Sequence, residues 1–145
     1  MKYTKHLILV AFLLLQSISA FAANWVLVGA SDNSQSFIDT ESMIRAGNKV
    51  QCWVSTNYNE PQTDILAVDF KNDKYSSDLF FIEYDCYNRT RIALEFTEYS
   101  QKDRRGSVVK TLSSIASSSA PSRIRPESVD EALLNFACKQ LMKKY

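Results

Sequence analysis

The chain has 145 residues, with 17 basic and 16 acidic side chains and a single histidine. This near balance of charge excludes proteins that attract nucleic acid or anionic lipid through a strongly basic surface. Aromatic side chains make up 12% of the residues and there are only 3 glycines. Such a composition favours pleated, half-buried strands over a helical bundle.

The first 22 residues are typical of a secretory signal peptide. Lys2 and Lys5 precede an apolar run at residues 7–15, and a small-residue motif at residues 20–22 follows it. The run is too short to span a bilayer comfortably, and no later segment is long and apolar enough to be a transmembrane anchor. We therefore expect cleavage after residue 22 and a single exported domain at residues 23–145.

Removal of the signal peptide would also remove His6, the only histidine of the chain. A nucleophile in the mature protein would then have no imidazole as its base, which excludes many enzyme mechanisms. Glu83 and Asp85 share a strand face, but they alternate with core residues as solvated carboxylates do, so we assign them no catalytic role. We expect a protein that is not an enzyme and has no metal or other cofactor.

Short strands are predicted after the signal peptide. Residues 25–28 and 36–39 form the first two. A third strand runs from Lys49 to Tyr58 with strict alternation, and one of its faces carries Val50, Cys52, Val54, Thr56 and Tyr58. The sequence Asn59-Glu60-Pro61 should end this strand, and residues 65–70 resume an extended pattern.

Two longer strands follow, separated by a turn near Asn88. One face of the first carries Phe80, Ile82, Tyr84 and Cys86. In the second, period two places Ile92, Leu94 and Phe96 on one face and Arg89, Arg91 and Glu95 on the other. Residues 101–106 form a charged hairpin tip before a strand at residues 108–112, and the serine-rich residues 113–122 form a loop.

The C-terminal segment changes to a helical period. Pro126 and a capping box at residues 128–131 open the helix, whose buried stripe consists of Val129, Leu133, Phe136, Ala137 and Leu141. The predicted fold is therefore α+β. It consists of an antiparallel sheet of about six strands with one C-terminal α-helix packed on one face.

The mature chain has an odd number of cysteines, which predicts one disulfide and one free thiol in an oxidising compartment. Cys86 lies on the apolar face of its strand and Cys138 on the flank of the helix that covers this face, so a bond between them would join helix to sheet. Cys52 also points inward and would then be the buried free thiol. Pairing of Cys52 with either of the other two remains an alternative, because registers predicted from sequence can slip.

Two groups of surface residues are candidates for ligand contact. Tyr87, Arg89 and Arg91 lie near the turn at Asn88, and Arg104 and Arg105 lie at the hairpin tip. Arginine beside tyrosine on an exposed loop suits anionic glycans or acidic protein surfaces. Solvated edge charges that oppose aggregation are the alternative interpretation.

Trp53 and Phe81 are candidates for an interface. Alternation places both on the face opposite Cys52 and Cys86, which the helix does not cover. Large apolar side chains gathered on an exposed face usually mark a contact with another chain. Either the sheet curls so that the two rings form a second small core, or this face binds a partner, most simply a second copy of the chain.

Several short motifs occur in a fixed order: residues 37–40 (FIDT), 44–47 (IRAG), 50–53 (VQCW), 83–86 (EYDC) with Arg89 and Arg91, 106–109 (GSVV), and 126–128 (PES) leading to Ala137-Cys138. In this order and spacing the chain resembles the surface-adhesin protein E family of Gram-negative bacteria over nearly its whole mature length. The resemblance implies a small antiparallel sheet with a C-terminal helix, a Cys86–Cys138 disulfide and a tendency to dimerise. For the founding member it also implies binding to host extracellular-matrix proteins.

The founding member of that family is a surface lipoprotein, whereas Ala23-Asn24 follows the signal peptide here and offers no cysteine for lipid attachment. We therefore expect a periplasmic or secreted protein that is not a lipoprotein. The expected function is non-enzymatic, adhesin-like binding of a protein or glycan, with host extracellular-matrix proteins among the partners. The alternative is a periplasmic structural or accessory protein that binds itself or another envelope protein.

Overall fold

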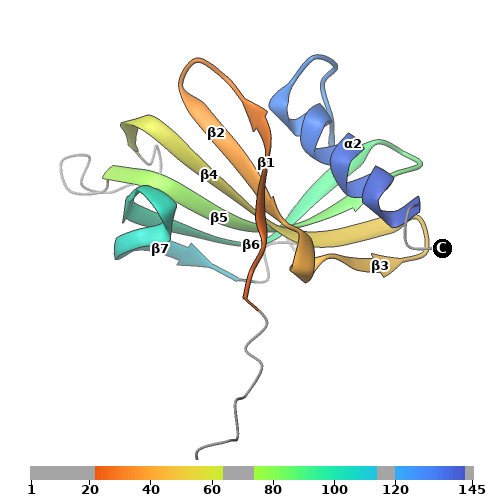
Figure 1. Ribbon diagram of the computed structural model, residues 1–145, viewed down its shortest axis with the longest axis horizontal. Coiled ribbons are helices and arrows are strands. Elements are labelled where there is room, and N and C mark those ends of the chain that lie inside the picture. The colour runs from red at the N-terminus through yellow and green to blue at the C-terminus, as the bar shows by residue number, and fades with distance from the viewer. Residues whose placement is uncertain (1–21, 64–73, 114–119, 143–145) are drawn as a thin grey trace, which may run out of the picture.

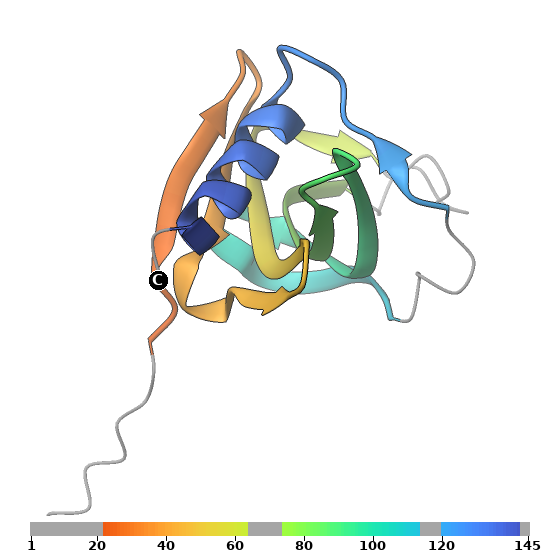
Figure 2. The same cartoon turned by 90° about the vertical axis from the view of Figure 1, so that its right-hand side faces the viewer.

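The computed structural model describes residues 22–63, 74–113 and 120–142. One curved antiparallel sheet dominates it, and a C-terminal helix lies against the concave side of that sheet (Figures 1 and 2). The strands are β1 (Trp25–Ala30), β2 (Ser34–Asp39), β3 (Ile44–Ala46), β4 (Lys49–Thr63), β5 (Lys74–Asp85), β6 (Thr90–Gln101), β7 (Arg105–Leu112) and β8 (Ser122–Arg123). Residues 1–21 of the predicted signal peptide, the extended segment predicted at residues 65–70, most of the serine-rich loop and the side chain of Leu141 lie outside the described residues.

Six strands follow one another across the sheet in the order β1-β2-β4-β5-β6-β7, while β3 pairs with β4 and β8 with β6. The helix is α2 (Val129–Met142), and two single 3₁₀ turns are η1 (Thr40–Ser42) and η2 (Lys102–Arg104). This architecture confirms the predicted α+β fold, with an antiparallel sheet and a C-terminal helix. The short strands β3 and β8 were not predicted.

The face of the sheet that contacts α2, called the inner face here, carries the apolar side chains that the alternation predicted. Val50, Cys52 and Val54 of β4 lie opposite residues 84, 82 and 80 of β5. Leu133, Leu134 and Ala137 of α2 complete the buried cluster. Because burial of one large apolar side chain contributes about 1.5–3 kcal/mol, this cluster is a main source of the stability of the fold.

Strand β4 does not end at residues 59–61, as we had predicted. It continues to Thr63, and its pairing with β5 is irregular between Asn57 and Gln62. Pro61 lies inside this interval and is exposed, so its missing N–H removes no bond from the ladder. The proline is therefore accommodated by an irregularity of the strand and does not end it.

The faces predicted for β6 are wrong for the first part of the strand. Phe81 pairs with Glu95 but Ile82 pairs with Ala93, so Leu94 is an extra residue in β6. Such a bulge breaks the period of two. Arg91 consequently lies opposite Tyr84 on the inner face, whereas period two had placed it on the other side from Phe96.

The start of helix α2 agrees only in part with the predicted capping box. The N–H of Glu131 donates to Ser128 Oγ at 3.2 Å, which makes Ser128 the N-cap. The carboxylate of Glu131 does not return to Ser128 but accepts from the N–H of Glu127 at 2.8 Å and pairs with Arg89. The first turn of the helix is therefore tied to the β5–β6 turn as well as to its own cap.

Two further features hold α2 against the sheet. The Cys86–Cys138 disulfide is present, which confirms the predicted pairing, and Cys52 is free and buried. On the other side, β1 approaches the start of α2 so closely that a Cβ atom at Gly29 would lie 2.8 Å from Val129 Cγ1. A side chain at position 29 would therefore push the helix away from the sheet.

Candidate binding surfaces

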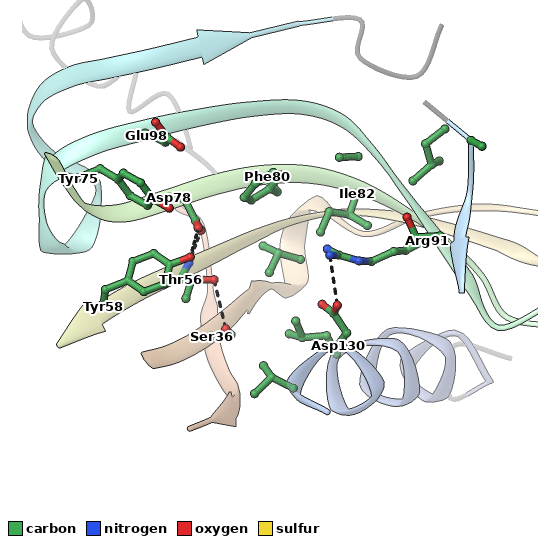
Figure 3. Close-up of a pocket in the computed structure, with 17 residues that line it drawn as sticks. Ser36, Thr56, Tyr58, Tyr75, Asp78, Phe80, Ile82, Arg91, Glu98 and Asp130 are labelled. Carbon is green, nitrogen blue, oxygen red and sulfur yellow. Dashed lines mark hydrogen bonds and ion pairs between the residues drawn. The ribbon is translucent and has the colours of Figure 1, made fainter. Parts of the chain in front are cut away.

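The inner face is not covered along its whole length, and a cavity of about 400 Å³ lies beside α2 (Figure 3). Figure 3 shows Tyr58, Tyr75, Asp78 and Glu98 at one end of this pocket and Arg91 with Asp130 at the other, with Phe80 and Ile82 between them. Ala120 and Ser122 in the lining are exposed, so the pocket reaches the surface. The cavity is of the size that small organic ligands occupy, roughly 300–1,000 Å³.

Asp78 is the central polar group of the acidic end. Its side chain is almost fully buried, and its two oxygens accept hydrogen bonds from the N–H of Thr56 at 3.0 Å and the hydroxyl of Tyr58 at 2.6 Å. Burial raises the pKa of Asp78, although these two hydrogen bonds oppose the rise. Ser36 extends the network, because its hydroxyl lies 3.2 Å from that of Thr56.

A second carboxylate faces the first. Glu98 of β6 lies directly opposite Asp78 of β5 and is also buried. Lys110 of β7 lies directly opposite Glu98 on its other side, so a basic residue belongs to the same row as the two carboxylates. Two pairs of aromatic rings lie on the same strands or on β4: Tyr58 contacts Tyr75 edge-on at 5.5 Å between centroids, and Phe80 is stacked with the ring of residue 96 at 5.4 Å.

The other end of the pocket is electrically balanced. Arg91 of β6 pairs with Asp130 in the first turn of α2 at 3.2 Å. Sequence reasoning did not place Arg91 here, because the bulge in β6 is not visible in the alternation. Asp78 and Glu98 were also missed, although each falls in phase with inward apolar residues of its own strand. A carboxylate in an apolar phase is the signal that would have found them.

On the opposite face of the sheet, called the outer face here, Trp53 and Phe81 lie directly across from each other on β4 and β5. Their ring centroids are 4.9 Å apart, and both side chains are only half-buried. On the same face, Leu27 of β1, which β2 separates from β4, and Ile44 of β3, which pairs with β4, are 51% and 56% exposed. We call these four residues the outer patch. Alternation had predicted correctly that the two aromatic side chains lie away from Cys52.

Arg104 lies across one side of the outer face. Its guanidinium donates to Ser55 Oγ at 2.8 Å and stands 4.1 Å from the centre of the Trp25 ring. Its backbone N–H donates to Ser77 Oγ at 3.0 Å. Ser55 and Ser77 are fully buried as a result, so Arg104 is held within the molecule by three contacts.

The other predicted contact residues do not form one surface. Arg89 binds Glu131 and Asn135 of α2, as Arg91 binds Asp130. Tyr87 is 81% exposed in the turn before β6, whereas Arg105 is exposed beyond the other end of that strand. The two candidate loops therefore lie at opposite ends of β6.

The carboxylates Glu83 and Asp85 have structural partners. Glu83 accepts from Lys49 at 2.6 Å and from Gln51 at 2.8 Å, and these bonds lower its pKa. Asp85 accepts from the backbone and side chain of Asn88, which lowers its pKa too. Within the described ranges, no group of three or more His, Cys, Asp or Glu side chains is arranged to hold a metal ion.

The buried thiol of Cys52 is chemically unsuited to attack an external substrate. It is completely shielded from solvent, and burial raises its pKa to about 12. A nucleophilic cysteine needs an accessible thiolate, usually stabilised by a cation or a helix N-terminus. Cys52 therefore belongs to the core.

Comparison of the chain with known proteins finds one matching family and solved structures of similar fold. The family model of surface-adhesin protein E matches residues 25–139. Two solved structures of Haemophilus influenzae protein E are similar in fold. The first has a TM-score of 0.58 at 13% identity and covers 90% of this chain and 96% of that one. The selenomethionine form has a TM-score of 0.57 at 12% identity and covers 88% and 95%.

A search of curated protein sequences finds no match. No helix among the described residues has the length and apolar character needed to cross a membrane.

Proposed function

Because the chain belongs to the surface-adhesin protein E family, we propose that it is a non-enzymatic binding protein of the bacterial cell envelope. In its full form the proposal is that residues 1–22 are a cleaved signal peptide and that residues 23–145 form one domain. This domain engages a protein partner, and host extracellular-matrix proteins are the partners to test first. The family's description as surface adhesins supports the general role.

The observation that carries the proposal is the outer patch. Trp53 and Phe81 contact each other on the face that α2 leaves open, and the same face carries the exposed side chains of Leu27 on β1 and Ile44 on β3. Aromatic anchors at the centre of an interface commonly contribute 2 kcal/mol or more to binding. A half-buried pair of rings in contact is pre-ordered, so little side-chain entropy is lost when a partner covers it.

Polar groups border the outer patch. Lys49, Gln51 and Glu83 form a hydrogen-bonded group on the same face, and Gln51 and Glu83 lie two residues along their strands from the aromatic pair. An apolar centre with a charged rim is the usual anatomy of a protein interface. The patch therefore suits a protein surface better than a lipid, which would favour a basic rim.

The proposal is tested by solid-phase binding of the mature protein to immobilised fibronectin, laminin and collagen. Trp53→Ser should weaken binding at least tenfold, and Ile44→Ser, at a position already more than half exposed, should weaken it without disturbing the fold. Val108→Ser on β7 is the matched control, since Val108 is equally exposed and lies outside the patch. Equal losses for Ile44→Ser and Val108→Ser would contradict the assignment of the patch.

The partner and the place of action are distinguished by two further measurements. Detection on intact cells or in the medium supports adhesion. Strict retention in the periplasm, with no binding to any matrix protein, would overturn that role in favour of an accessory protein of the envelope. Sedimentation of the mature protein at high concentration tests self-association, and dimers that Trp53→Ser dissociates would make a second copy the occupant of the patch.

A further inference from the structure

A further cavity, of about 360 Å³, adjoins the Arg91 end of the pocket on the inner face. Residues of β6, β8 and the start of α2 line it: Arg91, Ser122, Arg123, Arg125, Ser128 and Asp130. We call it the arginine cavity. We propose that it binds the phosphate or sulfate group of a sugar monoester through Arg123 and Arg125, two residues that the sequence alone did not single out.

The backbone that carries these two arginines is held by hydrogen bonds and by packing. Arg123 belongs to β8, which pairs with β6, and the N–H of Ile124 donates to the carbonyl of Arg89 at 3.2 Å. The carbonyl of Arg125 accepts from the hydroxyl of Ser128 at 2.6 Å. Ile124, between the two arginines, packs against the buried cluster. Both side chains therefore start from ordered positions, which lowers the entropic cost of binding a ligand.

The carboxylates near the cavity are bound to other arginines. Asp130 pairs with Arg91 at 3.2 Å (Figure 3), and Glu131 pairs with Arg89. Glu131 also accepts the backbone N–H of Glu127 at 2.8 Å. The side chain of Glu127 is exposed, and this residue does not belong to the lining of the cavity. The two carboxylates nearest to the cavity are thus already neutralised.

Positive charge is therefore in excess at this site. Residues 89–91 and 122–131 together contain four arginines and three carboxylates, so one positive charge is uncompensated even when Glu127 is counted. Among the residues that the structure describes, neither Arg123 nor Arg125 forms an ion pair, and both are exposed. Their guanidinium groups are available to an anion from solution.

The chemistry of two neighbouring guanidinium groups favours a tetrahedral oxyanion. Each guanidinium presents parallel N–H groups that bind two oxygens of one phosphate or sulfate group, and such charge-assisted bonds are stronger than neutral ones. A phosphate ester offers three free oxygens, which two arginines can share. A carboxylate offers only two and would leave one guanidinium unused. Nucleic acid is disfavoured because the whole chain is nearly balanced in charge.

The rest of the lining accounts for a sugar. The cavity is larger than one tetrahedral anion, and its volume lies in the range that small organic ligands occupy, roughly 300–1,000 Å³. The hydroxyl of Ser122 and the carboxylate of Asp130 belong to the same lining and can bond the hydroxyl groups of a sugar. Asp130 would repel a second anionic group. One charged group on a neutral sugar therefore fits the cavity better than a free anion does.

Calorimetric titration of the mature protein tests this proposal with glucose 6-phosphate, glucose 6-sulfate, glucose and inorganic phosphate as probes. We expect at least one of the two esters to bind at least tenfold more tightly than glucose and than inorganic phosphate. Arg123→Gln and Arg125→Gln should each reduce the affinity for that ester at least fivefold. Arg105→Gln is the matched control, because Arg105 is also exposed and its loss changes the net charge equally, but it lies outside the cavity. Thermal unfolding verifies that the three variants fold.

The other outcomes are equally decisive. If neither ester binds at millimolar concentration, or if glucose or inorganic phosphate binds as tightly as the esters, the proposal is wrong. Equal losses for all three arginine variants would also overturn it, since they would indicate attraction by net charge alone. Tighter binding of glucose 6-phosphate supports a phosphorylated sugar, and the reverse order supports a sulfated one. Trp53→Ser on the outer face should leave ester binding unchanged, so failure here and failure of the adhesin role are distinguishable.

Discussion

The inner face of the sheet has two halves of different chemistry, although β4 and β5 build both. In the helix-covered half, Val50, Cys52 and Tyr84 are nearly inaccessible beneath α2. Further along the same strands and in the same phase, the pocket half carries Ser36, Thr56, Tyr58, Asp78 and Glu98. The alternation of residues along a strand therefore determines which face of the sheet a side chain occupies. Contact with α2 determines which part of the inner face must be apolar.

The largest effect is expected from the covalent link that holds α2 over the helix-covered half. Cys138→Ser removes a disulfide that spans 52 residues, which should lower the free energy of unfolding by about 4 kcal/mol. Urea denaturation measures this loss. Cys52→Ala is the control, since it removes a buried thiol from the same cluster without cutting a cross-link and should cost about 1 kcal/mol. Equal losses of stability for the two variants would show that the cross-link does not hold α2 on the sheet more strongly than the packing of a buried side chain does.

A matched pair of tyrosines compares the two halves directly. In the pocket half, Tyr58→Phe removes a donor to Asp78, so it should lower the free energy of unfolding by about 1–2 kcal/mol. In the helix-covered half, the hydroxyl of Tyr84 is buried and has no hydrogen-bond partner among the residues that the structure describes. Tyr84→Phe should therefore be neutral or stabilising by up to about 1 kcal/mol. Thermal unfolding of the two variants measures both changes in stability. A larger loss for Tyr84→Phe than for Tyr58→Phe would contradict the predicted difference between the two halves.

A smaller effect separates the carboxylates of the two faces by their response to pH. The pKa of Asp78 is raised in the folded state, so this group destabilises the fold above its folded pKa, and the penalty disappears as the pH falls through that pKa. The pKa of Glu83 is lowered, so its contribution is present above the unfolded pKa and is lost as the pH falls through the folded one.

These signs predict opposite behaviour of two variants. Asp78→Asn should raise the free energy of unfolding at pH 7, with the gain shrinking toward pH 3. Glu83→Gln should lower it at pH 7 by up to about 1 kcal/mol, because an ion pair with half-exposed Lys49 is weak, and this loss should also shrink toward pH 3. Urea denaturation between pH 3 and pH 7 checks both. A loss of stability for Asp78→Asn at pH 7 would contradict the cost assigned to its burial.

The smallest perturbation is a chemical probe of the helix-covered half. Because the thiol of Cys52 is buried with a pKa of about 12, iodoacetamide at pH 8 should modify it roughly a thousandfold more slowly than a free cysteine. Modification should become fast in urea. Mass spectrometry measures the rate, and complete labelling of the folded protein within minutes would show that α2 does not seal this half.

The sequence was sufficient to predict the two faces of β4 and β5 and the buried side of α2, because the apolar residues recur there with periods of two and 3.6. It was insufficient for β6, where the extra residue Leu94 reverses the phase and brings Arg91 inside. A bulge has no signature in the alternation, and neither has the length of sheet that one helix covers.

The pocket was not predicted because the sequence does not show how the strands are placed against one another. Ser36, Thr56, Asp78 and Glu98 come from four strands, and although the two carboxylates fall in an apolar phase, no single strand shows that the four side chains meet. Only the registers that place Thr56, Asp78 and Glu98 in one row across the sheet reveal that they meet. By contrast, the sequence predicted that Trp53 and Phe81 share the outer face, because each lies next to a core residue of its own strand and so points to the opposite side of the sheet.

The division of the inner face into a helix-covered half and a pocket half is tested most directly by amide hydrogen exchange of the mature protein, followed by two-dimensional ¹H–¹⁵N NMR. We predict that the amides of Val50, Cys52 and Tyr84, beneath α2, exchange at least tenfold more slowly than those of Tyr58 and Glu98 in the pocket half. Equal exchange rates in the two halves, or faster exchange beneath α2, would contradict the account.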